Sequence, residues 1–168
     1  MKTRLLASFL APLLAGWVGL AGAQQAVILV RHAELAGAAM AAPKNLMLSP
    51  EGVARAERLA AVLKDAGVAA IYVTDFARTQ DTAAPLAQAL GQAPVVVPKG
   101  DPQELVQRLR GQHAAQTVLL VGHTDTLPGL LRALGHPEDL KVEPQDFGSI
   151  FVVAPREGGR AAFVRLRY

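Results

Sequence analysis

The sequence predicts an α/β domain of three layers (α/β/α), with a mostly parallel central sheet and an antiparallel edge hairpin at the C-terminus. Short apolar runs rich in β-branched residues alternate with segments of helical periodicity. Two of these runs, residues 27–30 and 118–121, hold no polar side chain, which is typical of strands buried on both faces of a parallel sheet. Two final runs flank a turn with Gly158-Gly159, which favours a hairpin.

Local start and stop signals place the elements in order. The first strand runs into Arg31 and His32, and a loop rich in small residues follows at 33–48. Ser49-Pro50-Glu51 predicts a helix start, because a hydroxyl cap, a proline in the first turn and an acid all favour a helix N-terminus. Gly67 is typical of its end. The remaining predicted elements are a strand at 69–74, a helix at 75–90, a strand at 94–98, a helix from 101 to about 113, a strand at 118–121, a helix at about 128–134, and strands at 149–154 and 161–167.

The first 23 residues have the pattern of a secretory signal peptide. Lys2 and Arg4 precede an apolar run at 5–20, and small residues at 21–23 fit cleavage before Gln24. A retained membrane anchor is the alternative, but prolines and glycines interrupt the run and no basic cluster follows it. We therefore expect a signal peptide at 1–23, one domain at 24–168, no membrane span after signal removal, and an exported protein in the periplasm or outside the cell.

Composition excludes several classes of function. The chain has no cysteine, which removes disulfides, thiolate metal sites and cysteine nucleophiles. Its three serines stand outside any nucleophile-elbow pattern, which argues against a serine hydrolase. Without residues 1–23 the charge balance is 15 basic against 14 acidic residues, and no basic run suggests nucleic acid. The tripeptide at 146–148, Asp-Phe-Gly, occurs in kinases, but no accompanying kinase motif is present, and we interpret it as coincidence.

Two predicted parallel strands each end at a histidine, and ligands of such sheets bind beyond the carboxyl ends of the strands. His32 follows Arg31, and His123 follows the strand at 118–121. Arg78 lies four residues past Thr74, the end of another inner strand. Arginine forks match the oxygens of a phosphoryl group, and they repel a divalent cation. A histidine nucleophile that attacks phosphorus is therefore favoured over a metal site.

Four segments together resemble those of a known family. They are Val30-Arg31-His32-Ala33-Glu34, Leu48-Ser49-Pro50-Glu51-Gly52, Thr74-Asp75-Phe76-Ala77-Arg78-Thr79-Gln80-Asp81-Thr82-Ala83 and Val121-Gly122-His123-Thr124-Asp125-Thr126. In this order they resemble the histidine phosphatase superfamily, whose fold is phosphoglycerate-mutase-like. The short chain is similar to the compact branch without a cap domain. One departure is Ala33, where the family commonly has glycine.

The resemblance implies a role for each matching residue. His32 is expected to be the nucleophile that takes the phosphoryl group as phosphohistidine. Arg31, Arg78 and His123 are expected to bind the phosphate oxygens, together with His32. No metal and no organic cofactor is implied.

The proton donor for the leaving group is less well defined by the sequence. Asp101 is the first candidate and Glu104 the second, since the family commonly places a carboxylate after the arginine helix. Both also fit structural roles, as a helix cap and a capping-box acid. We interpret Asp125 as a cap of the next helix and Glu34 as an orienting partner of Arg31.

These features predict an exported, metal-independent phosphomonoesterase with a phosphohistidine intermediate. Its expected partner is a small phosphorylated substrate or a phosphorylated envelope component. One alternative is a module that binds phosphorylated ligands on the same fold with reduced catalysis. Another is a phosphotransferase similar to phosphoglycerate mutase, although little sequence is available for a lid. The sequence gives no oligomeric state.

Overall fold

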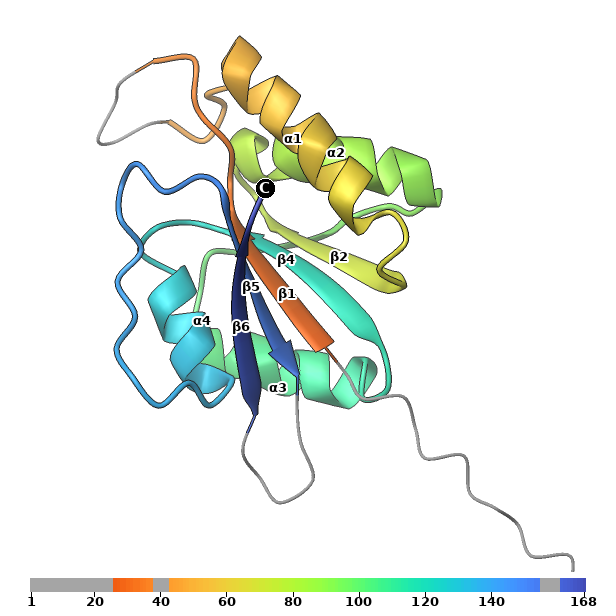
Figure 1. Cartoon of the computed structure of the whole chain (residues 1–168), viewed down its shortest axis with the longest axis vertical. Coiled ribbons are helices and arrows are strands. Elements are labelled where there is room, and N and C mark those ends of the chain that lie inside the picture. The colour runs from red at the N-terminus through yellow and green to blue at the C-terminus, as the bar shows by residue number, and fades with distance from the viewer. Residues whose placement is uncertain (1–25, 38–42, 155–160) are drawn as a thin grey trace, which may run out of the picture.

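The computed structural model describes residues 26–37, 43–154 and 161–168 (Figure 1). The expected signal peptide at 1–23 and the Gly158-Gly159 turn lie outside these ranges. The strands are β1 (Ala26–Arg31), β2 (Val68–Thr74), β3 (Val95–Val97), β4 (Thr117–Gly122), β5 (Ser149–Ala154) and β6 (Ala162–Arg167). The helices are α1 (Pro50–Leu63), α2 (Ala77–Leu90), α3 (Pro102–Gln112) and α4 (Leu127–Ala133).

The strands form one mixed sheet in the order β3-β2-β4-β1-β5-β6. β1, β2, β3 and β4 pair in parallel, and β5 runs antiparallel to both β1 and β6. The chain moves outward from β1 to β3 through α1 and α2, and then returns through α3 to place β4 beside β1. The predicted fold class, with its C-terminal antiparallel hairpin, is confirmed.

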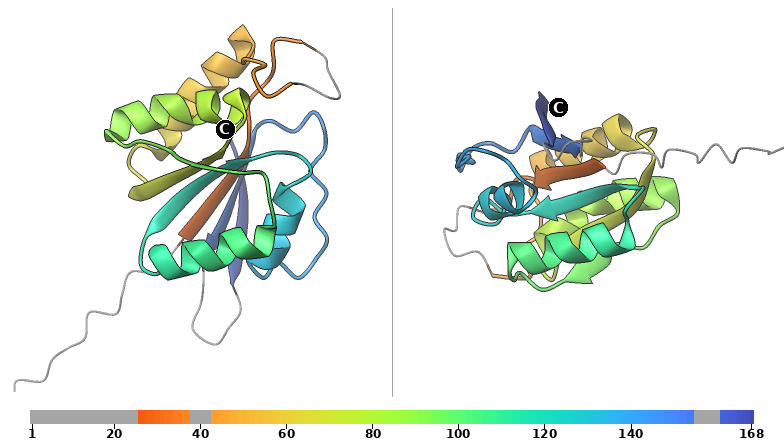
Figure 2. Two further views of the ribbon diagram at one scale, coloured as in Figure 1. Left: turned by 180° about the vertical axis from the view of Figure 1, so that it is seen from behind. Right: turned by 90° about the horizontal axis from the view of Figure 1, so that it is seen from below.

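Helices cover both faces of the sheet, as two further views show (Figure 2). Alternate residues of β1 point to opposite faces, so Val27 and Leu29 pack with α3 and α4 while Ile28 and Val30 pack with α1 and α2. The same alternation holds in β4. Because both faces are covered, these strands must be apolar throughout, which explains their uninterrupted runs of aliphatic residues.

The helix signals in the sequence act as expected, with one shift. Ser49 caps α1 by accepting a hydrogen bond from the Gly52 N–H, and Pro50 opens the helix. α2 begins at Ala77, two residues later than predicted. The backbone N–H of Ala77 donates instead to the carbonyl of Lys44, so a contact with the 43–48 loop holds the preceding residues out of the helix.

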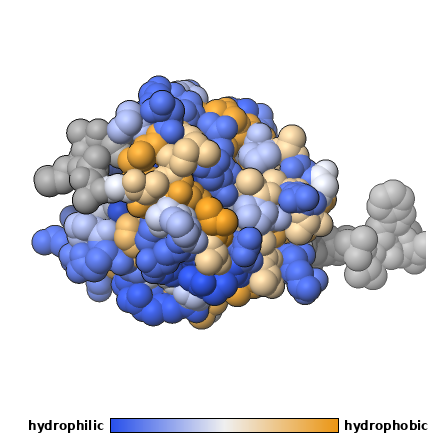
Figure 3. All heavy atoms as spheres, turned by 90° about the horizontal axis from the view of Figure 1, so that it is seen from above, coloured by the Kyte–Doolittle hydropathy of each residue, from blue (hydrophilic) through white to orange (hydrophobic). Residues whose placement is uncertain are grey.

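Figure 3 shows the molecule from above, the side on which α1 and α2 lie in Figure 1, and apolar residues reach this surface among hydrophilic ones. Exposed apolar side chains of the described residues include Met47 and Val53. None of the described helices has both the length and the apolar character needed to cross a bilayer.

Candidate functional site

The two histidines lie side by side because of the sheet register. Arg31, the last residue of β1, pairs with Gly122, the last residue of β4. The next residue of each strand is a histidine, and the His32 N–H donates to the Gly122 carbonyl at 2.9 Å. The rings of His32 and His123 lie 5.4 Å apart between centroids, edge to face. The sequence predicts that these two strand ends meet, and in the structure the backbone pairing of β1 with β4 brings them together.

His32 is held as a neutral imidazole with one free nitrogen. Its Nδ1 lies 2.8 Å from the carbonyl oxygen of Ala33, which can only accept, so Nδ1 carries the proton. Nε2 forms no hydrogen bond within the described residues, and its lone pair is available. Burial lowers the pKa of His32 to about 4, against the raising effect of the Ala33 carbonyl, and the charges of Arg31 and Arg78 lower it further. At neutral pH the ring is therefore a neutral imidazole with an available lone pair rather than an imidazolium.

His123 has the opposite tautomer. The Arg78 Nε–H donates to its Nδ1 at 3.3 Å, so Nε2 carries the proton and donates to the Thr74 hydroxyl at 2.9 Å. Thr74 in turn bonds to the Thr79 hydroxyl, which donates to the Phe76 carbonyl. Burial lowers the pKa of His123 to about 3, and the neighbouring His32, Arg78 and Lys99 act in the same direction. This chain of hydrogen bonds fixes the ring orientation.

The two predicted arginines flank the histidines, and neither has a carboxylate partner among residues 26–37, 43–154 and 161–168. Arg78 is 8% exposed, yet no salt bridge among the described residues includes it; its Nη1 donates to the Pro43 carbonyl at 3.3 Å. Arg31 likewise forms no salt bridge in these ranges and donates to the Pro144 carbonyl, and its buried Nε has no partner. A buried cation without a counterion is costly, so the buried Arg78, with the half-buried Arg31 near it, indicates a place for an anion.

Two phenylalanines complete the site, and sequence reasoning missed both. Phe76 lies 5.0 Å from His123 and Phe147 lies 6.2 Å from His32, measured between ring centroids. Arg78 stacks on Phe76 at 4.2 Å, and Arg31 stacks on Phe147 at 3.9 Å. Each of the four rings therefore lies beside the next in the order Phe76, His123, His32 and Phe147, and an arginine stacks on each phenylalanine.

Phe147, the middle residue of the tripeptide at 146–148, lies beside His32, although nothing here gives the tripeptide a kinase role. Asp146 is buried and pairs with Arg165 and Arg167 of β6, and it accepts a hydrogen bond from Ser149. These contacts hold Phe147 beside His32. A signal was present in the sequence: because β5 is antiparallel, the residues before it lie at the same sheet edge as the end of β1.

Two lysine–aspartate pairs stand near the histidines and were also missed. Lys44 pairs with Asp75, and Lys99 pairs with Asp125. The charge of Asp125 reaches both histidines and Arg78. The expected role of Asp125 as a helix cap is wrong, since Thr126 occupies the cap position of α4. The lysine contacts lower the pKa of both carboxyls, for Asp125 against the opposing effect of burial.

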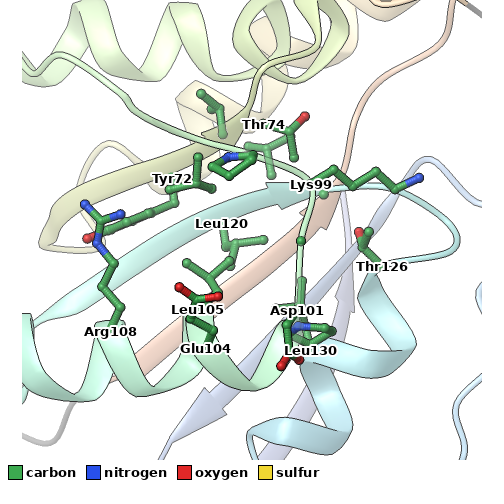
Figure 4. Close-up of a pocket in the computed structure, with 17 residues that line it drawn as sticks. Tyr72, Thr74, Lys99, Asp101, Glu104, Leu105, Arg108, Leu120, Thr126 and Leu130 are labelled. Carbon is green, nitrogen blue, oxygen red and sulfur yellow. The ribbon is translucent and has the colours of Figure 1, made fainter.

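The proposed acids Asp101 and Glu104 lie apart from this cluster. The Asp101 carboxylate caps α3 by accepting from the Gln103 N–H at 2.9 Å, and Glu104 is exposed in the first turn. Both line a cavity of about 140 Å³ between α3, α4 and the sheet (Figure 4). Thr74 also lines it, so this cavity lies behind the hydrogen bonds of His123. No contact between these acids and His32 is found in the described part of the chain, and their role as proton donors stays a prediction.

Residues of the first two motifs build the support beneath His32. Ala33 is fully buried, its methyl packs with Leu48 and Ala56, and its N–H donates to Thr82. The methyl group therefore lies in a small apolar cluster. A Cβ at Gly52 would collide with the Glu34 carbonyl, which explains the glycine. The Glu34 side chain binds Arg55 rather than Arg31, so its expected orienting role is wrong.

Comparisons with solved structures agree with this fold. A protein histidine phosphatase SixA, complexed with tungstate, is 19% identical, with 84% of this chain and 96% of that chain covered and a TM-score of 0.63. A mycobacterial glucosyl-3-phosphoglycerate phosphatase in complex with VO3 is 16% identical, with 84% of this chain and 98% of that chain covered and a TM-score of 0.68. A phosphoserine phosphatase mutant from Entamoeba histolytica, bound to phosphoserine, is 15% identical, with 83% of this chain and 95% of that chain covered and a TM-score of 0.64. Among curated proteins, no relative matches the chain.

Comparison of the amino-acid sequence with protein families agrees with the comparison of structures. The family that matches is described as histidine phosphatase superfamily (branch 1), over residues 27–100. This match includes the first three of the four segments on which the resemblance rests, and the structure carries the fourth to the same sheet edge. Residues 27–100 thus match the histidine phosphatase superfamily (branch 1), and the described chain has the fold of solved histidine phosphatases.

Proposed function

We propose that the protein is a phosphomonoesterase that hydrolyses its substrate through a phosphohistidine on His32 without a metal ion. The observation that carries the proposal is the pair of guanidinium groups, at residues 31 and 78, that face two neutral histidines without a carboxylate partner in the described part of the chain. A tetrahedral phosphoryl dianion supplies the missing negative charge.

The chemistry follows from the free nitrogen of His32. Its Nε2 attacks phosphorus, the N–P bond forms, and the P–O bond to the leaving group breaks. A water molecule then attacks the phosphohistidine, which releases inorganic phosphate and restores the neutral ring. Donors fixed around the phosphoryl oxygens stabilise the transition state without reorganisation, and each is typically worth about 3–4 kcal/mol.

Positive charge supports the metal-independent form of the proposal. Arg31 and Arg78 both act electrostatically on His32, and Lys99 acts on His123. A divalent cation at this position would be repelled by all three side chains. The same charges attract a phosphate group.

The neighbours with solved structures support a phosphatase but differ in their named substrates, which include phosphoserine and glucosyl-3-phosphoglycerate. We therefore propose a small phosphorylated compound or a phosphorylated envelope component. The pattern of residues 1–23 supports export and action in the periplasm or outside the cell.

Turnover of p-nitrophenyl phosphate by the purified protein, with and without EDTA, tests the proposal. We expect turnover that EDTA leaves unchanged, a His32→Ala variant without measurable activity, and trapped phosphohistidine on the wild type after acid-free quenching. His136→Ala is the matched control, since that half-buried histidine bonds to Glu138 and packs on Phe163, away from His32. Wild-type protein that binds phosphate without turning over any ester would identify a binding module instead.

A further inference from the structure

We infer that the site selects phosphate monoesters of aromatic alcohols, whose ring is held against Phe76 and Phe147. This inference rests on the proposed function, because it names the substrate class for the same site. It is carried by the position of the two phenylalanine rings relative to the arginines.

The rings stand where the leaving group must lie. Each arginine expected to hold the phosphoryl oxygens is stacked on a phenylalanine, Arg31 at 3.9 Å and Arg78 at 4.2 Å from the ring centroid. A phosphate bound by both guanidinium groups is therefore bordered by phenyl rings on two sides.

Both rings keep part of their surface accessible. Phe76 and Phe147 are half-buried, whereas His32 and His123 between them are buried. Accessible apolar rings beside a charged site gain free energy when an aromatic group covers them. A sugar or glycerol leaving group would place hydroxyl groups against these rings and would leave them without partners.

The carboxylates around the site favour the same class. Asp75 and Asp125, whose charges interact with His123, are each paired with a lysine, and Asp101 caps α3. Each of these three carboxylates is already engaged, by a lysine or by the backbone of α3. An aryl oxide departs with the electron pair of the broken P–O bond and needs no proton, because a phenol has a pKa near 10, whereas an alkoxide is nearly as basic as hydroxide.

The experiment separates recognition of the ring from reactivity of the ester. Dissociation constants of phenylphosphonate and ethylphosphonate, which cannot be hydrolysed, are measured by calorimetry for wild type, Phe76→Leu and Phe147→Leu. Steady-state turnover of phenyl phosphate and ethyl phosphate is measured in parallel. Phe163→Leu is the matched control, since Phe163 lies on β6 and contacts His136. Phe147→Tyr keeps the ring, and thermal unfolding checks that each variant is folded.

We expect wild type to bind phenylphosphonate more tightly than ethylphosphonate by about tenfold, and each leucine variant to lose about twofold to tenfold of that ratio. Phe163→Leu and Phe147→Tyr should keep it. If the phenylalanines have only a structural role, the leucine variants bind both phosphonates more weakly by the same factor, and the ratio of the two affinities does not change. That result overturns the inference. Equal affinity of the wild type for the two phosphonates also overturns it. A preserved preference for phenylphosphonate without turnover of either ester overturns the proposed function and leaves the ring selectivity standing.

Discussion

Lowering the pH from 7 to 5 should destabilise the protein by about 4 kcal/mol through His32 and His123. Burial keeps both rings neutral when folded, with pKa values of about 4 and about 3, whereas an unfolded histidine titrates near 6.5. Below pH 6.5 the unfolded chain therefore binds protons that the folded protein does not. Stability is present above this pH and is lost as the pH falls toward 4.

The size of the effect follows from linkage. At pH 5, protonation of each histidine in the unfolded chain favours unfolding by about 2 kcal/mol. At pH 7 it favours unfolding by almost nothing. Two such groups give the total of about 4 kcal/mol, a large share of the 5–15 kcal/mol that stabilises a typical domain. This estimate needs only that both folded pKa values lie below 5.

Urea unfolding at several pH values between 7 and 5 measures the effect. A double variant, His32→Asn with His123→Asn, cannot titrate at these positions and should lose about 4 kcal/mol less over the same range. Carboxylates contribute equally to both proteins, so they cancel in the difference. Parallel curves for wild type and variant would refute the view that the site holds two neutral imidazoles.

Three further predictions concern the supports of the site. Thr74→Val removes the hydroxyl that accepts from His123 and should cost about 1–3 kcal/mol in urea unfolding and lower kcat, whereas Thr74→Ser should retain both; equal values for the two variants would contradict the hydrogen-bond chain. Gly52→Ala places a methyl against the Glu34 carbonyl and should lower stability by about 1–3 kcal/mol, while Gly111→Ala, in open space on α3, should raise it by up to about 1 kcal/mol. Asp146→Asn should weaken the hold on Phe147, raise KM for an aryl phosphate and cost about 1–3 kcal/mol; Asp139→Asn, in an exposed pair with Arg132, should change neither stability nor KM, and similar losses in both would argue against a role for Asp146.

The sheet and the central residues could be predicted because their signals are local. Apolar runs reveal buried strands, and parallel strands carry their carboxyl ends to one edge. This reasoning was enough to bring His32, His123, Arg31 and Arg78 together.

The surrounding residues could not be placed in this way because their positions depend on contacts between distant segments. Phe147 faces His32 because Asp146 is tied to β6, and Lys44 sets the start of α2 through a loop contact. Neither relation leaves a periodic pattern in the sequence. The proton donor was difficult to predict for a different reason. Asp101 has the sequence context of a helix cap, and it does cap a helix, so the local sequence does not distinguish a structural acid from a catalytic one.

The spacing between the two imidazoles is set by main-chain pairing of Arg31 with Gly122, and not by any loop. Exchange of the loop segment at 136–148 for that of a relative should therefore alter which compounds are accepted while the spacing of the two histidines stays the same. A chimera of this kind could change the substrate specificity, because the paired strands would keep the two histidines at the same distance from each other.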